Sequence, residues 1–158
     1  MGMDVYGKSP LGEKGEYFRR SLWSWHPLWD LVTDLVPWVK DAVANGHTND
    51  GDGLDAEQAA QLAIDLKALL ESGEVVITLL DVGHHLADLP DVVCEWCKGT
   101  GVRTDEVGQS MGMAARGWCN GCDGKGTRQD DRRMYQVSVQ DVREFAEFVR
   151  ESGGFEIL

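Results

Sequence analysis

The sequence contains one eight-residue pattern twice, as Cys94-Glu95-Trp96-Cys97-Lys98-Gly99-Thr100-Gly101 and as Cys119-Asn120-Gly121-Cys122-Asp123-Gly124-Lys125-Gly126. Both copies have the form CxxCxGxG, and they use all four cysteines of the chain. Two CxxC pairs with no cysteine left over are typical of a four-thiolate metal site, and Zn²⁺ is the ion that such sites usually hold. Four thiolate ligands leave no open position for water, so the pattern predicts one structural zinc and not a catalytic one.

The segment around these cysteines is rich in glycine and polar residues and has little apolar material of its own. We therefore expect residues 91–128 to be held together by the metal, and to lose their structure without it. The glycines after each CxxC pair let the backbone turn beneath the ion. The expected metal ligands are Cys94, Cys97, Cys119 and Cys122.

The charge of the chain is strongly negative and unevenly distributed. The formal net charge is −12, and residues 41–93 contain 1 basic and 11 acidic side chains. Such a surface repels phosphate backbones, so we expect a partner protein, one with a basic surface, ahead of nucleic acid. No apolar run approaches the ~20 residues that span a bilayer, so no membrane partner is expected. Cysteines that bind a metal fit a reducing compartment, and we expect the cytoplasm.

Hydrophobic spacing in the N-terminal third predicts mainly helix. Residues 1–12 are expected to form an irregular arm and residues 13–22 a short helix. Apolar residues at helical spacing predict an amphipathic helix over 28–44, which Pro37 kinks or divides into two. Residues 45–53 are rich in glycine, asparagine and aspartate and predict a loop.

The next stretch predicts a well-capped helix followed by an ambiguous segment. Asp55 and Gln58 match a capping box at the start of a helix over 55–72, and Gly73 is suited to end it. Residues 74–82 contain enough β-branched residues for a strand, but their apolar spacing also continues as a helix. Both alternatives stay open on the sequence alone.

The C-terminal segment predicts a strand and a helix that complete the core. Apolar and polar residues alternate over 134–139 as in a strand, and Ser138 and Asp141 then match a second capping box. Gly153 should end the helix, and the apolar C-terminus should pack on the core. The residues expected to be buried are Val142, Phe145, Phe148, Val149, Phe155, Ile157 and Leu158.

These elements predict a mostly helical α+β fold, with one domain and a projecting, zinc-stabilised hairpin module. Residues 1–93 would form the helical N-terminal part of the core, and residues 94–128 the zinc module. Residues 129–158 would add the C-terminal strand and helix.

The repeated pattern resembles the cysteine-rich zinc finger of DnaJ-type (Hsp40) co-chaperones over residues 94–126. That family has four CxxCxGxG repeats and two zinc sites, whereas this chain has two repeats, enough for one site. The resemblance implies the same four cysteine ligands, with short hairpins around the ion. It does not extend further, because a J-domain needs His-Pro-Asp where this chain has His26-Pro27-Leu28. The rest of the chain resembles small uncharacterised phage and bacterial proteins, notably over residues 15–19 and 49–54.

We therefore expect a small, non-enzymatic, zinc-binding protein that binds a partner protein. The expected role is that of a phage or mobile-element protein that modulates or inhibits a host defence system. One alternative is a nucleic-acid-binding regulator that uses the tryptophans and arginines of the finger: Trp96, Trp118, Arg103, Arg116, Arg128, Arg132 and Arg133. In the other interpretation, which we favour, the tryptophans cover the metal and the arginines neutralise the excess negative charge of its thiolate ligands.

A second alternative is an enzyme with a site near His47, Asp50 and Asp52, where the histidine would do acid–base work. The acidic stretch 49–55 also leaves open a second metal. The oligomeric state is not predicted.

Overall fold

The computed structural model describes residues 2–158, which form two compact units. The first, which we call the helical unit, consists of the chain up to His84 together with Met134–Leu158. The second, the cysteine unit, is His85–Arg133. The cysteine unit is thus an insertion in the sequence of the helical unit, and it is wider at both ends than the module predicted over 94–128.

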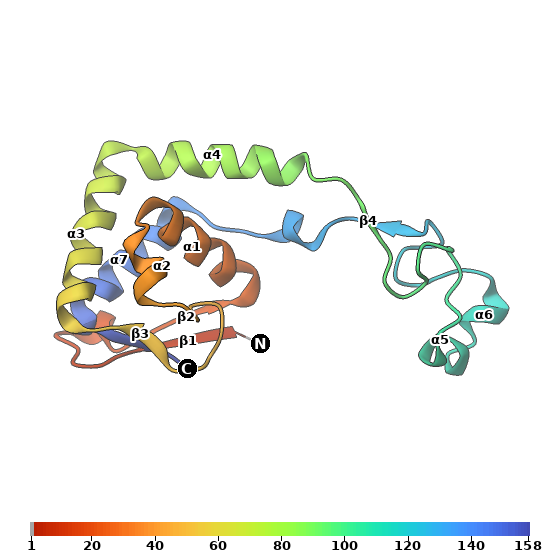
Figure 1. Ribbon diagram of the computed structural model, residues 1–158, viewed down its shortest axis with the longest axis horizontal. Helices are drawn as coiled ribbons and strands as arrows, with labels where there is room; N and C mark the ends of the chain where they lie inside the picture. Colours follow the sequence, from red (N-terminus) through yellow and green to blue (C-terminus); the bar gives the residue numbers. More distant parts are fainter. Residues whose placement is uncertain (1) are drawn as a thin grey trace. The chain divides into compact units, whose positions relative to one another are not determined.

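A four-stranded antiparallel sheet in the order β2-β1-β6-β3 brings the two ends of the chain together. Strand β1 (Gly2–Gly7) pairs with β2 (Tyr17–Ser21) on one side and with β6 (Phe155–Ile157) on the other, and β3 (Asp52–Leu54) pairs with β6. Alternate residues of the central strands are buried, as expected when helices cover one face of a sheet (Figure 1).

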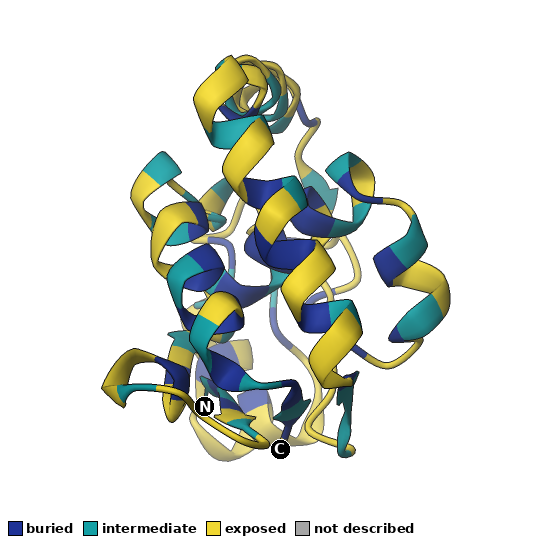
Figure 2. Cartoon of the chain, turned by 90° about the vertical axis from the view of Figure 1, so that its left-hand side faces the viewer, coloured by how far each residue is buried: buried dark blue, intermediate teal, exposed yellow. Residues whose placement is uncertain are grey.

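Five helices complete the helical unit: α1 (Leu22–Leu35), α2 (Trp38–Ala42), α3 (Ala56–Ser72), α4 (Glu74–Ala87) and α7 (Val139–Ser152). Buried and exposed residues alternate along them with helical spacing (Figure 2). The core is aromatic: Trp25 and Trp29 stack with centroids 5.5 Å apart, and Phe145 meets Trp25 edge-on at 5.8 Å. The indole Nε1 of Trp25 donates to the carbonyl of Gly46 at 2.8 Å, which ties the predicted loop to the core.

The mostly helical α+β class is confirmed, but the N-terminal prediction is wrong. Residues 2–7 of the expected arm form β1, while residue 1 lies outside the described residues. In place of a helix over 13–22 there are a 3₁₀ turn, η1 (Glu13–Gly15), and strand β2. Pairing with β1 makes residues 17–21 a strand, and the end of β1 lies close to η1, because a Cβ on Gly7 would lie 2.0 Å from the carbonyl oxygen of Gly15. The sequence prediction also missed β3.

The predictions for the middle of the helical unit are confirmed in most respects. Helix α1 ends before Pro37 and α2 begins after it, although α1 starts earlier than expected. The capping box of Asp55 and Gln58 is present at the start of α3, and Gly73 has a left-handed φ of 81°. The ambiguous segment is helix, because α4 continues directly from that glycine.

The strand predicted over 134–139 is wrong. The chain passes from η2 (Asp131–Met134) to α7 without pairing in a sheet. The N–H of Gln136 donates to the carbonyl of Trp23 at 3.2 Å. That carbonyl lies four residues before Pro27, which has no N–H to offer it within α1. An extended segment therefore bonds to a helix here and not to another strand.

The remaining C-terminal predictions are confirmed except for the last residue. The Ser138–Asp141 capping box opens α7, and the predicted apolar face of α7 is buried. Gly153 ends α7 with a φ of 60°, and the side chains of Phe155 and Ile157 are fully buried in β6. The side chain of Leu158 is instead 46% exposed.

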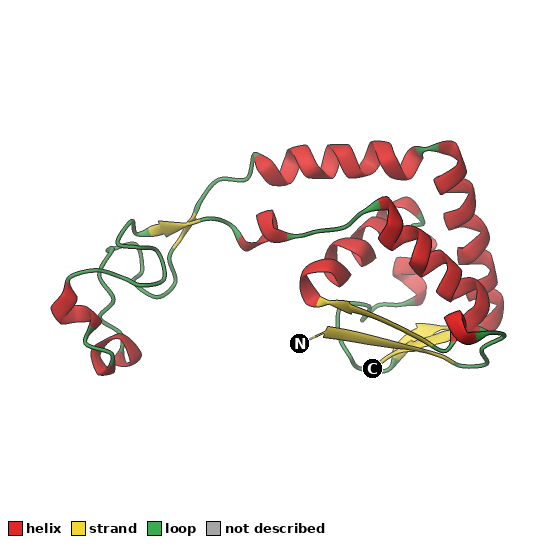
Figure 3. Ribbon diagram, turned by 180° about the vertical axis from the view of Figure 1, so that it is seen from behind, coloured by secondary structure: helices red, strands yellow, loops and turns green. Residues whose placement is uncertain are grey.

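The cysteine unit is built mainly of loops (Figure 3). Its regular elements are β4 (Val92–Val93) paired with β5 (Thr127–Arg128), and the short helices α5 (Glu106–Ser110) and α6 (Met113–Arg116). Its cluster of buried apolar residues consists of the four cysteines alone. None of the described helices, in either unit, is long and apolar enough to span a bilayer.

Helix α3 offers a matched pair of substitutions that tests the packing of the helical unit. Leu62 is fully buried and Ile64 is 63% exposed. Leu62→Ala should lower the free energy of unfolding by about 2–5 kcal/mol because it leaves a cavity. Ile64→Ala should change it by less than about 0.5 kcal/mol. Urea unfolding followed by circular dichroism at helical wavelengths measures both, and equal effects would contradict the packing described here.

Candidate metal centre

The four cysteine sulfur atoms converge in the cysteine unit. They lie within 4.8 Å of one another, and all four residues are buried. The first cysteines of the two repeats, Cys94 and Cys119, have sulfur atoms 3.9 Å apart, and the second cysteines, Cys97 and Cys122, have theirs 3.7 Å apart. A tetrahedral ion with metal–sulfur bonds of about 2.3 Å separates its sulfur ligands by about 3.8 Å. The predicted ligand set therefore fits a metal ion.

The two repeats have the same backbone conformation, position by position. After the second cysteine, the fifth residue of each repeat has a left-handed φ, 54° at Lys98 and 51° at Asp123. The two glycines of each repeat are left-handed as well, with φ from 76° to 85°. This conformation is costly for residues with a Cβ but not for glycine, so the GxG tail lets each turn close around its sulfur atoms.

The two turns also pack against each other reciprocally through their glycines. A Cβ on Gly101 would lie 2.5 Å from the carbonyl oxygen of Gly124, and a Cβ on Gly126 would lie 2.5 Å from that of Gly99. Gly126 accepts a hydrogen bond from the N–H of Cys94 at 2.9 Å, next to the β4–β5 pair. The glycines therefore serve the contact between repeats as well as the turn within each one.

Backbone N–H groups and burial act on the thiols in opposite directions. Burial raises the pKa of the Cys97 thiol, but hydrogen bonds from the N–H groups of Gly101 and Gly99 and from neighbouring thiols outweigh it and lower that pKa to about 7. Burial raises the pKa of Cys119 to about 11, although the N–H of Gly121 donates to its sulfur at 3.4 Å. Metal binding must displace protons from such thiols, so it is favoured by higher pH.

One buried arginine holds the loop between the repeats. Arg103 is 7% exposed, and its guanidinium pairs with Asp105 through two hydrogen bonds of 2.6 and 3.0 Å. It also donates to the side chain of Asn120 at 3.2 Å and lies over the indole of Trp96, 4.5 Å from the ring centroid. The arginine therefore joins the start of the loop to both repeats. Only the short Arg-x-Asp spacing could have indicated this pair in the sequence.

The other arginines of the unit are mostly bound to carboxylates. Arg128 pairs with Asp131 and with Glu95, Arg132 with Asp130, and Arg133 with Asp91. The hydrogen bonds from Arg132 hold the pKa of Asp130 at about 2. Arg116 contacts the sulfur atom of Met113 at 3.9 Å. These arginines thus pair with neighbouring carboxylates, and the charges of Arg103 and Arg128 also interact with the cysteines.

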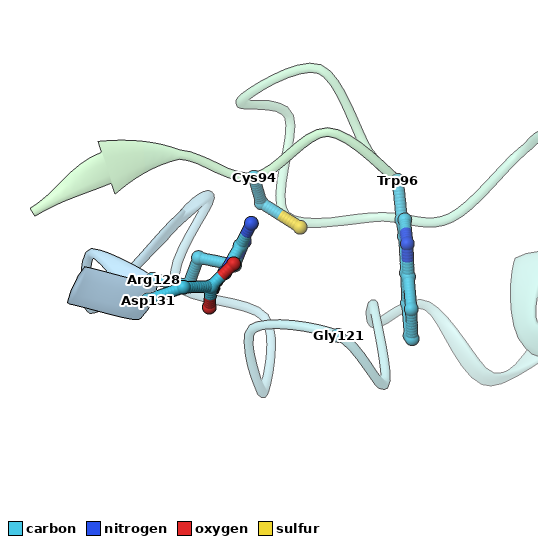
Figure 4. Close-up of a pocket in the computed structure, with 5 residues that line it drawn as sticks. All are labelled: Cys94, Trp96, Gly121, Arg128 and Asp131. Carbon is cyan, nitrogen blue, oxygen red and sulfur yellow. Dashed lines mark hydrogen bonds and ion pairs between the residues drawn. The ribbon is translucent and has the colours of Figure 1, made fainter. Parts of the chain in front are cut away.

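A pocket of about 300 Å³ lies beside Cys94. Figure 4 shows Trp96 on one side of it and Arg128 with Asp131 on the other, with the backbone of Gly121 between them. Trp96 packs closely on this backbone, since a Cβ on Gly121 would lie 2.3 Å from the indole. Trp96 is nevertheless 49% exposed and Trp118 39% exposed, so each tryptophan also presents part of its ring at the surface.

The residues predicted for an alternative active site make different contacts. His47 bonds to His26, with their Nδ1 atoms 2.7 Å apart, and its Nε2 lies 2.9 Å from Asp30. Partial burial and the neighbouring His47 lower the pKa of His26. Asp52 lies in β3 and accepts hydrogen bonds from the backbone N–H of Asn45 and of Gly53, both at 2.8 Å. The histidine pair could not be found in the sequence, because its members are 21 positions apart.

Among the described residues 2–158, the cysteines are the one group of three or more histidine, cysteine or acidic side chains close enough to share an ion. The stretch 49–55 is not such a group.

No protein-family model, curated protein or solved structure matches the chain. The similarity to the DnaJ-type finger rests on the CxxCxGxG pattern itself. Function must therefore be inferred from the geometry of this chain.

Two left-handed glycines allow the contact between the repeats to be tested separately from backbone strain. Gly101 has a φ of 76° and no room for a Cβ, whereas Gly117 has a φ of 74° and nothing within 4 Å of one. Gly101→Ala should weaken metal retention at least about tenfold, a difference of about 1.4 kcal/mol. Gly117→Ala has similar backbone strain and should retain the metal. Competition with a chromogenic chelator measures both, and equal retention would show that the close approach is unimportant.

Proposed function

We propose that this chain is a small zinc-binding protein of the cytoplasm that acts by binding a partner protein and catalyses no reaction. Four buried cysteines with their sulfur atoms within 4.8 Å of one another suit zinc, the usual ion for structural sites of this kind, and four thiolate ligands leave no position for substrate. The four cysteines form no disulfide, which fits a reducing compartment.

The observation that carries the proposal is the exposure of large apolar side chains on the cysteine unit. Because an ion replaces the hydrophobic core, these side chains are free to face outward, and exposed apolar and aromatic residues are typical of protein-binding surfaces. They are Val93, Trp96, Val107, Met111 and Trp118, each 39–62% exposed.

The charge of the same unit supports a protein partner ahead of nucleic acid. Residues 85–133 contain 7 basic and 8 acidic side chains, and four thiolates with Zn²⁺ add two further negative charges. Most of its arginines are already paired with carboxylates. Affinity for phosphate backbones comes from unpaired basic residues, so this unit has little to offer a nucleic acid.

The biological role that we propose is that of a phage or mobile-element modulator or inhibitor of a host defence system. It is supported by the resemblance of residues 15–19 and 49–54 to small uncharacterised phage and bacterial proteins. The strong negative charge of residues 41–93 supports a partner with a basic surface.

Metal analysis tests the first part of the proposal. The purified chain should contain stoichiometric zinc, and Cys119→Ser should lose it, whereas Ser110→Ala in the loop should not. On chelation, amide exchange should become fast across residues 85–133 and stay slow in the core of the helical unit. Iron in place of zinc, or a cysteine unit that stays protected without metal, would contradict this assignment.

Affinity purification from the native source tests the second part. We expect a stoichiometric protein partner that is lost with Trp96→Ala or Val107→Ser, provided that these variants keep their zinc. Leu11→Ser is the control, since Leu11 is 83% exposed and lies on the helical unit. Recovery of nucleic acid that is released by salt and lost with Arg128→Ala would favour the nucleic-acid regulator instead.

A further inference from the structure

Helix α4 has an apolar face whose large side chains are mostly exposed. Only Val75 of this helix is fully buried, with Leu79 packed partly against the core. On other sides of the helix, Val76 is 44% exposed, Ile77 62% and Leu80 59%. Leaving three large aliphatic side chains of one helix in water is unfavourable, and such a face marks a contact with another molecule.

The spacing of this face is that of a seam between two helices. Val76, Leu80, Gly83 and Ala87 follow one another at intervals of four, three and four residues, so they lie in a stripe along α4. We call these four residues, together with Ile77 beside them, the α4 stripe. Branched residues at one end and small ones at the other allow a second helix to approach closely.

Gly83 is the residue of this stripe that the helical unit does not explain. It lies inside a helix, where glycine is unfavourable, and a Cβ there would meet nothing within 4 Å. Its φ is helical, so no turn requires it. A partner helix that crosses α4 at this point would account for the missing side chain.

Acidic residues lie beside Ile77, along one edge of the α4 stripe, and they indicate the charge of the partner. Glu74 and Asp81 are seven residues apart and thus lie on the same side of α4, and Asp88 follows directly after the helix. There is no lysine or arginine between Lys67 and Lys98. A second copy of the chain would bring like charges together along this flank, whereas a basic helix would be attracted to it.

We propose that the α4 stripe is a docking surface for an amphipathic helix of a partner protein, with an apolar seam flanked by lysine or arginine. The inference rests on the proposed function, since it identifies the kind of segment by which a partner protein would be recognised. It uses helix α4 and does not require a bound metal ion.

A designed helical peptide is the probe for this surface. It has about 21 residues, leucine and alanine at seam positions, and lysine at the flanking positions. A second peptide has the same seam with glutamate in place of lysine, and a third has the residues of the first in scrambled order. Fluorescence anisotropy with the full-length, zinc-loaded chain should show saturable binding of the lysine peptide alone, weakened by salt.

Three variants test the geometry of binding. Leu80→Gln and Gly83→Gln should each weaken binding of the lysine peptide at least about tenfold. The double variant with Glu74→Lys and Asp81→Lys should reverse the preference and bind the glutamate peptide. Ile64→Gln is the matched control, because Ile64 is equally exposed on α3, and it should bind like the unchanged chain. Circular dichroism confirms that each variant is folded.

Three outcomes would overturn the inference. The first is equal binding of lysine and scrambled peptides, or binding insensitive to Leu80→Gln. The second is a dimer of the chain alone that Leu80→Gln dissociates, because the stripe would then bind a second copy. The third is slow amide exchange over residues 76–87 that becomes fast on metal removal, because the cysteine unit would then cover the stripe. The lysine peptide can fail to bind while affinity purification still recovers a partner protein that Trp96→Ala abolishes. That combination would refute the α4 stripe as the docking surface but would leave the proposed function standing.

Discussion

Four sulfur atoms that meet around one point determine the structure of the cysteine unit. The four cysteines form its buried apolar cluster, and Leu89 and Met113 are the only other large apolar side chains buried among its described residues 85–133. Everything else in the unit follows from bringing two turns to the same place. The glycines are left-handed because each turn closes tightly, and they lack side chains where one turn meets the carbonyl groups of the other. Without an ion, the buried thiols would have only one another and a few N–H groups as partners.

The helical unit is held together by an apolar core and by strand pairing, and not by metal ligands. Its core is a cluster of tryptophan and phenylalanine side chains from both ends of the chain, and strand β1 pairs with the C-terminal strand β6. The cysteine unit begins at His85, within the last turn of α4, and ends before α7. Apolar burial stabilises the helical unit, whereas we propose that an ion holds the cysteine unit, so loss of metal should affect the two units very differently.

Surface chemistry is also divided between the units. The arginines of the cysteine unit are largely compensated by carboxylates, and its exposed large apolar side chains are aromatic, aliphatic or methionine. The helical unit, by contrast, offers an apolar stripe flanked by uncompensated acids on α4. Two exposed apolar surfaces of different character, on a chain of net charge −12, are consistent with a protein that works by binding.

The sequence by itself determined what local chemistry controls. The cysteine spacing defined the ligand set, and the capping boxes at Asp55 and Ser138 located the starts of two helices, because each depends on residues a few positions apart. Tertiary structure alone decided the rest. Whether residues 2–7 are an arm or a strand depends on β6, some 150 residues away, and the segment after Met134 bonds to a helix carbonyl freed by Pro27. The pairing of strands and the hydrogen bonding of a free carbonyl group both depend on residues far away in the sequence. A local sequence pattern therefore cannot show which distant segment a strand or a carbonyl will bond to.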